Sequence, residues 1–231
     1  MEAILLAGGL GTRLATRLNG VPKPMAPIAG RPFLAILLNQ LERAGCERVL
    51  LSVGHLHTVI MDCFGESFHG MRLDYVIEEA PLGTGGAIRT ALDHASDTNV
   101  LVLNGDTFLQ ADYAKMLEFH HAEDATLTMA ITHQADIARY GGVVVDGRRI
   151  VGFKEKGRSG PGWINAGSYL INRRLQWPEG LPKKFSFEVD MLAPEIDRIA
   201  SAAFAVDGVF LDIGVPEDLD RAQTVLAGFE R

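Results

Sequence analysis

The sequence predicts an α/β fold in which a largely parallel sheet is covered by helices on both faces. Apolar runs of strand length alternate with amphipathic helical patterns through the first 110 residues, which is typical of parallel sheets. Beyond this point the pattern changes to a mixture of helices and strands, and Asp146-Gly147 gives a clear hairpin signal. Because the 231 residues contain no linker, repeat or low-complexity segment, we expect one domain, 1–231, made of two halves, about 1–110 and about 111–231.

The first half begins with a short apolar strand, Ala3–Leu6, that leads into glycines. A helix follows, opened by Pro32 and closed by Gly45, because leucines recur along one face and proline and glycine favour these two positions. The remaining predicted elements are strands at Arg48–Val53, Arg72–Glu78 and Val100–Leu103, and helices at Thr58–Phe64 and Thr84–His94.

The second half mixes helices with antiparallel signals. Val143–Val145 and Arg149–Phe153 flank the Asp146-Gly147 turn and predict a hairpin. The other predicted elements are helices at Asp112–His121, Phe187–Ile199 and Glu217–Phe229, and strands at Ala125–Thr132, Trp163–Ile171 and Val209–Leu211.

The composition is that of an ordinary globular protein, with 47% apolar and 22% charged residues. A net charge of −7 argues against a nucleic-acid or anionic-membrane surface, since both need a basic face. Cys46 and Cys63 are isolated, so we expect reduced thiols rather than a disulfide or a metal site. No apolar run approaches the length of a membrane span or a signal peptide, so the cytoplasm is the expected location.

The strongest chemical signal is the glycine-rich run Leu6–Leu14 followed by Pro22-Lys23-Pro24. Glycines after a strand allow backbone N–H groups to approach phosphates closely. The dinucleotide fingerprint is excluded because Leu14 stands at its third glycine, and the P-loop because Thr12-Arg13 follows the last glycine. The sequence therefore predicts a different phosphate loop, with one arginine and, ten residues later, one lysine.

These residues resemble the signature of the sugar-1-phosphate nucleotidyltransferases, which join a nucleoside monophosphate to a sugar 1-phosphate and release pyrophosphate. The resemblance runs through the whole chain. It implies a three-layer Rossmann-like mixed sheet, the nucleotide-diphospho-sugar transferase fold, with a nucleotide-binding first half and a sugar-binding second half. It also implies that Arg13 holds the triphosphate and that Lys23 contacts the phosphates between which the bond forms, so both are expected to be catalytic. The loop residues that it assigns to the nucleotide are Leu6, Ala7, Gly8, Gly9, Gly11 and Thr12.

A second glycine-rich loop, Pro81–Ala87, starts a predicted helix, and its small residues would let a flat ligand lie against the backbone. It resembles the nucleobase-binding segment of the family. The resemblance implies that Pro81, Gly83, Thr84 and the nearby Glu79 line the base. Judged alone, the same residues also fit a simple helix-start turn.

Two aspartates follow predicted strands, Asp106 after Val100–Leu103 and Asp212 after Val209–Leu211. Ligands of open α/β sheets bind beyond the carboxyl ends of strands, and Mg²⁺ prefers carboxylate and phosphate oxygens. Since the family places its Mg²⁺ ligands at equivalent positions, the resemblance implies that Asp106 and Asp212 hold Mg²⁺ and that Asp106 is catalytic.

Three segments of the second half carry features expected of a sugar site. Gly141 would bring backbone close to a ligand, Glu155 offers a carboxylate to sugar hydroxyls, and Lys156 offers a cation to the sugar phosphate. The segment Asn165-Ala166-Gly167 resembles the family's N-x-G motif, which implies that Asn165 and Gly167 contact the sugar. Glu188 is expected to close this pocket. A hairpin strand and a glycine in a buried strand are the alternative interpretations.

Such a transfer needs no general base, because the attacking oxygen belongs to an ionised phosphate. Positioning and charge neutralisation suffice, and the motifs hold carboxylates and cations but no nucleophile. The non-enzyme alternative is an inactive nucleotide-sugar sensor on the same fold, and the presence of the two cations and two aspartates argues against it.

The segments 78–84 and 186–190 resemble guanylyltransferases that act on manno-configured sugars. GTP and D-glycero-α-D-manno-heptose 1-phosphate are therefore the expected substrates, for surface polysaccharide synthesis. Mannose 1-phosphate and a uridylyl or thymidylyl donor remain as alternatives, and the sequence does not indicate the oligomeric state.

Overall fold

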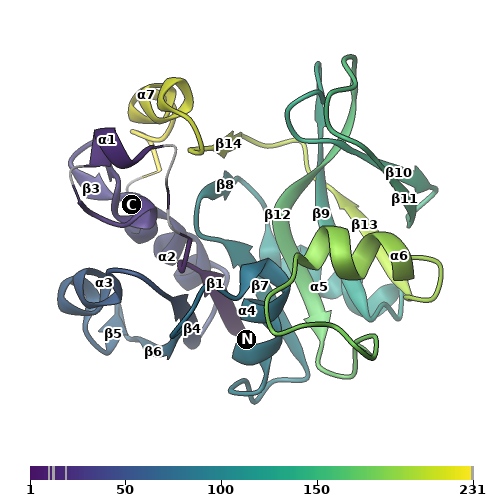
Figure 1. Ribbon diagram of the computed structural model, residues 1–231, viewed down its shortest axis with the longest axis horizontal. Coiled ribbons are helices and arrows are strands. Elements are labelled where there is room, and N and C mark those ends of the chain that lie inside the picture. The colour runs from purple at the N-terminus through teal and green to yellow at the C-terminus, as the bar shows by residue number, and fades with distance from the viewer. Residues whose placement is uncertain (10, 12–13, 19, 230–231) are drawn as a thin grey trace.

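Figure 1 shows the computed structural model, which describes residues 1–9, 11, 14–18 and 20–229. The predicted strands and helices of the first half are all present, with ends that differ by at most two residues. The structure adds short elements around residues 15–32, 67–68 and 107–109 that no pattern indicated. The elements of this half are β1 (Glu2–Leu6), α1 (Ala15–Leu18), the 3₁₀ turn η2 (Lys23–Met25), β2 (Pro27–Ile28), β3 (Arg31–Pro32), α2 (Phe33–Arg43), β4 (Arg48–Val53), α3 (His57–Phe64), β5 (Ser67–Phe68), β6 (Met71–Ile77), α4 (Gly83–Leu92), β7 (Asn99–Asn104) and β8 (Thr107–Leu109).

The second half holds the predicted hairpin and two further strands that extend the sheet. Its elements are α5 (Tyr113–Ala122), β9 (Leu127–Gln134), β10 (Gly142–Asp146), β11 (Arg149–Lys154), β12 (Gly162–Asn172), the π-helix η3 (Phe187–Leu192), α6 (Ala193–Glu195), β13 (Ser201–Ala205), β14 (Phe210–Asp212) and α7 (Pro216–Val225).

One mixed sheet connects the two halves. Eight of its strands follow the order β11-β10-β12-β7-β1-β4-β6-β5, and β9 and β13 continue it beside β12. Strands β7, β1, β4 and β6 are parallel, whereas β12 runs antiparallel to β7 and carries the sheet into the second half. The mixed α/β sheet confirms the predicted fold class.

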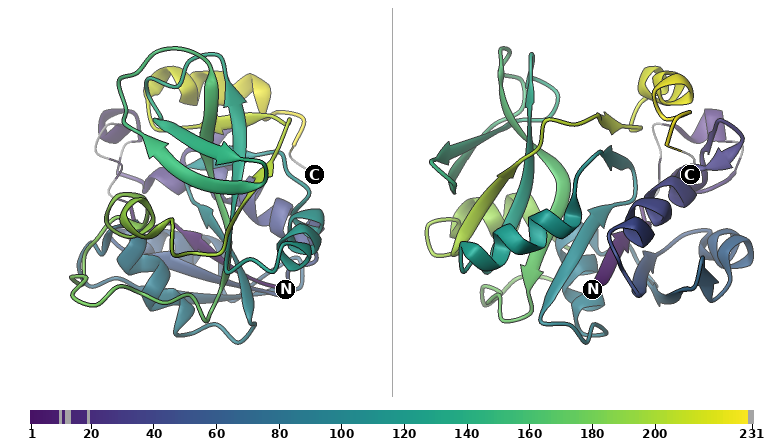
Figure 2. Two further views of the ribbon diagram at one scale, coloured as in Figure 1. Left: turned by 90° about the vertical axis from the view of Figure 1, so that its right-hand side faces the viewer. Right: turned by 180° about the vertical axis from the view of Figure 1, so that it is seen from behind.

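Apolar side chains cover both faces of this sheet. Alternate residues of β1 point to opposite faces, so Ala3 and Leu5 pack in one cluster with α2 and α5, while Ile4 packs in the other with α4 and η3. Figure 1 shows α4 and the η3–α6 segment on the near face, and the right panel of Figure 2 shows α2 and α5 on the far face. The two clusters give the three layers expected from the alternating pattern.

Two predictions about the last third of the chain were wrong in detail. The expected helix Phe187–Ile199 is a π-helix of six residues followed by three α-helical residues, where Pro194 has no N–H to donate. The last helix ends at Val225 instead of Phe229. The strand Ser201–Ala205 gave no signal because three of its five residues are alanines, and its parallel pairing with β9 defines it. Within the described ranges, every helix is too short or too polar to cross a bilayer.

Candidate active site

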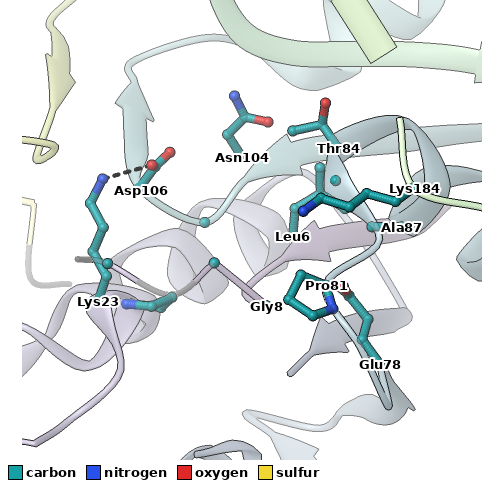
Figure 3. Close-up of a pocket in the computed structure, with 15 residues that line it drawn as sticks. Leu6, Gly8, Lys23, Glu78, Pro81, Thr84, Ala87, Asn104, Asp106 and Lys184 are labelled. Atoms are coloured by element: carbon teal, nitrogen blue, oxygen red, sulfur yellow. Dashed lines mark hydrogen bonds and ion pairs between the residues drawn. The ribbon is translucent and has the colours of Figure 1, made fainter. Parts of the chain in front are cut away.

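A cavity of about 430 Å³ opens where β1, β6 and β7 end, the edge at which open α/β sheets bind ligands (Figure 3). Figure 3 shows two ends of this cavity: a charged end with Lys23 and Asp106, and a loop end with Glu78, Pro81 and Thr84. The described residues that line it are Leu6, Gly8, Gly9, Gly11, Lys23, Pro24, Glu78, Pro81, Gly83, Thr84, Ala87, Asn104, Gly105, Asp106 and Lys184.

The glycine loop after β1 lines the cavity and touches the lysine that the sequence paired with it. Gly11 has φ +58°, and a Cβ at this position would lie 3.0 Å from the Cβ of Lys23. Any side chain at Gly8 would collide with the carboxylate of Glu78. Glycine at these two positions therefore lets the loop pack tightly between the two ends of the cavity.

Among the described residues that were predicted for this loop, Ala7 does not line the cavity. Ala7 is buried in the core, and its N–H donates to the carbonyl oxygen of Ser52 at 2.7 Å. Thr12 and Arg13 lie outside the described residues, so their roles stay predictions.

Lys23 and Asp106 form an ion pair at the charged end. The side chain of Lys23 is only 9% exposed, and its Nζ donates to Asp106 Oδ2 at 2.7 Å. Asp106 is 41% exposed, and its Oδ1 accepts a hydrogen bond from Thr107 Oγ1. The preceding Gly105 fixes this turn, because its N–H donates to the carbonyl oxygen of Leu6 at 2.9 Å. The sheet thus positions a buried cation and a partly exposed carboxylate at one strand end.

Asp212 reaches the same region through a small two-stranded sheet. Strand β14 pairs with β8 so that Asp212 lies opposite Thr107, and the N–H of Ile213 donates to the carbonyl oxygen of Asp106 at 3.0 Å. Asp212 Oδ2 accepts from Arg139 at 3.1 Å, and Arg139 also pairs with Asp218. Burial raises the pKa of Asp212, as does the charge of Asp106, while Lys23 and Arg139 oppose this rise.

The two aspartates fit a shared Mg²⁺. Burial and the like charge of Asp106 make the ionised form of Asp212 costly, and a bound divalent cation would offset that cost. Both side chains offer the hard oxygens that Mg²⁺ prefers. In the described ranges no three His, Cys, Asp or Glu side chains group closely enough to hold a metal. Phosphate oxygens of a substrate and water would therefore have to supply the remaining ligands.

Glu78, and not the predicted Glu79, is the carboxylate that lines the cavity at the loop end. Ser52 Oγ donates to Glu78 Oε1 at 2.9 Å, and the N–H of Leu82 donates to Oε2 at 3.1 Å. Glu79 is exposed and lines an adjoining groove beside His55 and His57. The single-residue difference arises because neighbouring residues at a strand end point to opposite sides.

The second loop contributes Pro81, Gly83 and Thr84 to the cavity, as the sequence predicted. Gly83 has φ +68°, and a Cβ there would lie 2.5 Å from the carbonyl oxygen of Phe185. Thr84 Oγ1 accepts a hydrogen bond from the N–H of Phe187 at 2.9 Å. The first turn of α4 is therefore bound to the segment just before η3.

Asn165 and Glu188 meet in a cluster of three side chains, which we call the polar cluster: Asn165, Tyr169 and Glu188. Asn165 Nδ2 donates to Glu188 Oε1 at 2.6 Å, and the hydroxyl of Tyr169 donates to the same oxygen at 2.9 Å. Asn165 Oδ1 accepts from the N–H of Gly167 at 2.9 Å, and a Cβ on Gly167 would lie 2.8 Å from Asn104 Nδ2. Since Asn104 lines the cavity, Gly167 links the polar cluster to it.

None of the predicted sugar residues is among the described residues that line the cavity, and three of them also lie apart from the polar cluster. Gly141 is buried, with φ +81°, and a Cβ there would lie 2.9 Å from the carbonyl oxygen of Lys154. Glu155 and Lys156 are exposed on the loop after β11. Gly141 and this loop thus lie against each other, and their proposed roles remain predictions.

The residues that the predicted site omitted include Asn104 and Lys184, which line the cavity, and Tyr169 of the polar cluster. Asn104 was visible as part of Asn104-Gly105-Asp106, and its place at the end of β7 is the signal that could have identified it. Lys184 and Tyr169 gave no local signal, because each is brought to the region by tertiary packing of the second half.

Comparisons with known proteins find a matching family, similar sequences and similar structures. The family model described as nucleotidyl transferase matches residues 2–227. The chain is 43% identical to the D-glycero-alpha-D-manno-heptose 1-phosphate guanylyltransferase of Aneurinibacillus thermoaerophilus, over 98% of both chains. It is 36% identical to the mannose-1-phosphate guanylyltransferase of Mycobacterium tuberculosis, over 98% of this chain and 64% of that protein. The crystal structure of HddC from Yersinia pseudotuberculosis superposes with a TM-score of 0.85 at 37% identity, covering 96% of this chain and 97% of that one, and HddC has also been solved in complex with GMP-PN.

Proposed function

The chain belongs to the nucleotidyl transferase family, and from this premise we propose that it is a heptose-1-phosphate guanylyltransferase. It would transfer GMP from GTP to D-glycero-α-D-manno-heptose 1-phosphate and release pyrophosphate. The observation that carries this proposal is that the glycine loop, the Lys23–Asp106 ion pair and the Pro81–Thr84 loop line the same cavity. The names of the relatives support the guanine donor and the heptose acceptor.

In the proposed reaction, a phosphate oxygen of the sugar 1-phosphate attacks the α-phosphorus of GTP. One P–O bond forms, the bond between the α-phosphorus and the bridging oxygen breaks, and pyrophosphate leaves with that oxygen and its electron pair. No proton has to be removed from the attacking oxygen. The enzyme must therefore bring two polyanions together and align them.

The described residues divide this task. Lys23 supplies a buried positive charge at the charged end, and Asp106 holds its amine in one position. Glycine-loop N–H groups approach phosphates without side-chain interference. Asp106 and Asp212 would hold Mg²⁺, which when bound neutralises phosphate charge and orients the triphosphate.

On the acceptor side, the polar cluster presents an acceptor for sugar hydroxyls. Both internal hydrogen bonds of Glu188 go to Oε1, and within the described part of the chain no group donates to Oε2. Oε2 is thus the oxygen that we assign to a sugar hydroxyl. We place the reaction in the cytoplasm, where the free thiols of Cys46 and Cys63 would stay reduced.

The test is a grid of GTP, ATP, UTP and dTTP against heptose, mannose and glucose 1-phosphates, with pyrophosphate release as the readout. We expect GTP with the manno-heptose 1-phosphate to give the highest kcat/KM. A higher kcat/KM with mannose 1-phosphate would reject the heptose assignment alone. A higher kcat/KM with UTP or dTTP would reject the guanylyl assignment.

A further inference from the structure

Residues 182–187, which we call the docking segment, are held against α4 by contacts on both sides of Lys184. Arg89 donates to the carbonyl oxygen of Pro182 at 3.1 Å. The carbonyl oxygen of Lys183 packs so closely against Gly86 that a Cβ there would collide with it. On the other side, the N–H of Phe185 donates to Leu82 O and the N–H of Gly85 donates to Phe185 O, both at 3.0 Å.

The ring of Phe185 fixes the segment further. Phe185 is 3% exposed, packs where a side chain at Gly85 would lie, and carries the Arg89 guanidinium 4.9 Å from its ring centre. The glycines of the second loop therefore have a second role: they allow the docking segment to approach α4 closely. The backbone of Lys184 is therefore held in place by contacts of the residues on both sides of it.

The side chain of Lys184 lines the cavity with Thr84 and Ala87, although it comes from the other half of the chain. Figure 3 shows its side chain extending into the cavity, with the amine beside Leu6. None of the ion pairs formed by the described residues includes Lys184. Its donor capacity is thus available to a ligand bound between the two loops.

We propose that Lys184 is a specificity-determining residue that donates a hydrogen bond to the keto oxygen of the nucleobase, so that guanine is selected over 6-aminopurines. The proposal rests on the proposed function, because it takes the base to lie at the loop end. It divides the Watson–Crick edge of guanine between two side chains: Glu78 accepts from the N1–H and the 2-amino group, and Lys184 donates to O6.

The chemistry of the bases supports this assignment. A lysine ammonium has three donors and no acceptor, so it pairs with O6 of guanine but not with the 6-amino group of adenine. Lys184 is exposed without a ligand, and a base that puts an amino group opposite it leaves two donors facing each other, so the hydrogen bond made to guanine is lost. The acidic Glu78 cannot make this distinction at the 6-position, because a carboxylate would favour the amino group.

The test compares Lys184→Met with wild type on four triphosphates: those of guanosine, inosine, 2,6-diaminopurine riboside and adenosine. Guanine and hypoxanthine share O6 but differ in the 2-amino group, whereas 2,6-diaminopurine keeps the 2-amino group and replaces O6 with an amino group. Methionine keeps the apolar stem and removes the charge. Lys183→Met is the matched control, since Lys183 is exposed in the same docking segment and does not line the cavity.

We expect Lys184→Met to lower kcat/KM by about 10–100-fold for GTP and by a similar factor for ITP. The values for the two 6-amino triphosphates should change little, so the preference for GTP over the diaminopurine nucleotide should fall by the same factor. Lys183→Met should leave all four values unchanged.

An equal loss on all four triphosphates would overturn the proposal, because it would place Lys184 on the phosphates or the ribose. The proposal would also be overturned if Lys184→Met and wild type had the same ratio of kcat/KM for GTP to kcat/KM for the diaminopurine nucleotide. Failure of the proposed function looks different: the wild-type enzyme itself would not use GTP. Circular dichroism of each variant establishes that the fold is intact.

Discussion

Glycine-rich loops with close backbone contacts form the proposed nucleotide side of the site, whereas hydrogen-bonded side chains beside the cavity form the proposed sugar side. On the nucleotide side, meaning the loops after β1 and β6 and the first turn of α4, glycines such as Gly11 and Gly83 adopt positive φ and leave no room for a Cβ. On the sugar side, meaning the polar cluster and Gly167, Asn165 and Tyr169 both donate to one oxygen of Glu188.

This difference predicts which substitutions impair each side. A backbone surface recognises its ligand through fixed N–H groups, so it is sensitive to added volume and insensitive to side-chain rotamers. A cluster of hydrogen-bonded side chains depends on each donor and acceptor, so replacing one atom disturbs its neighbours. The predictions below test this contrast, from the largest expected effect to the smallest.

Asp106→Asn should impair transfer most, because Asp106 lies where the two sides meet and pairs with Lys23. We expect turnover to fall by roughly 10²–10³, the range for removing one preorganised charged group. Pyrophosphate release measures it, with Asp62→Asn on α3 as the control. Full turnover by the variant, or turnover of wild type that persists in EDTA, would contradict the proposed Mg²⁺ site.

Glu188→Gln should separate the two sides. Replacing Oε2 with an amide group removes the proposed acceptor for a sugar hydroxyl, so KM for the sugar 1-phosphate should rise by about 10-fold or more. KM for GTP should stay within about twofold, because Glu188 is not among the residues that line the cavity. Glu179→Gln, on the exposed loop after β12, is the control. A matching rise in both KM values would show that the sides are not independent.

Gly83→Ala tests the sensitivity of the nucleotide side to volume. The new methyl group would meet the carbonyl oxygen of Phe185 at a residue with φ +68°. Gly180→Ala is a matched control, since Gly180 has φ +81° with nothing near its Cβ position. We expect Gly83→Ala to lower the free energy of unfolding by about 1–3 kcal/mol more than the control. Equal losses in urea denaturation would mean that φ strain alone matters.

His120, which belongs to neither side, predicts how folding stability depends on pH. It is 1% exposed, its ring contacts Thr128 Oγ1 at 2.8 Å, and burial lowers its pKa to about 4. The unfolded chain, with a histidine pKa near 6.5, therefore binds the proton first, so stability is lost as the pH falls from about 6.5 toward 4.

We expect this histidine to lower the free energy of unfolding by about 1–2 kcal/mol between pH 7 and pH 5. His120→Gln should remove that part of the pH dependence, while His94→Gln, at an exposed position, should retain it. Urea denaturation at the two pH values measures the difference. An identical pH dependence in wild type and His120→Gln would contradict the prediction.

The nucleotide side was largely predictable because its signals are local. A strand followed by glycines, as at Leu6–Gly11, specifies both the turn and its place at a sheet edge. Lys23 and Asp106 were expected in the same site and form an ion pair at 2.7 Å. Arg13 was expected with them and lies outside the described residues.

On both sides, the features that depend on strand register and packing were not predictable. The pairing of β6 with β4 decides that Glu78 rather than Glu79 lines the cavity. Gly141, Glu155 and Lys156 were expected beside Asn165, but the loops that carry them lie against each other instead. Lys184 and Tyr169 reach the region from positions that no spacing rule connects to it.

The sequence by itself determined the class of fold, the glycine loops and the residue types needed to handle phosphate. Apolar periodicity and glycine chemistry act over a few neighbouring residues, so they are readable in the chain. Only the tertiary structure decided which carboxylate faces the base, which oxygen of Glu188 stays available and which lysine enters the cavity. Those outcomes depend on strand register and on contacts between distant segments, such as the docking segment on α4, and such contacts leave no pattern in the local sequence.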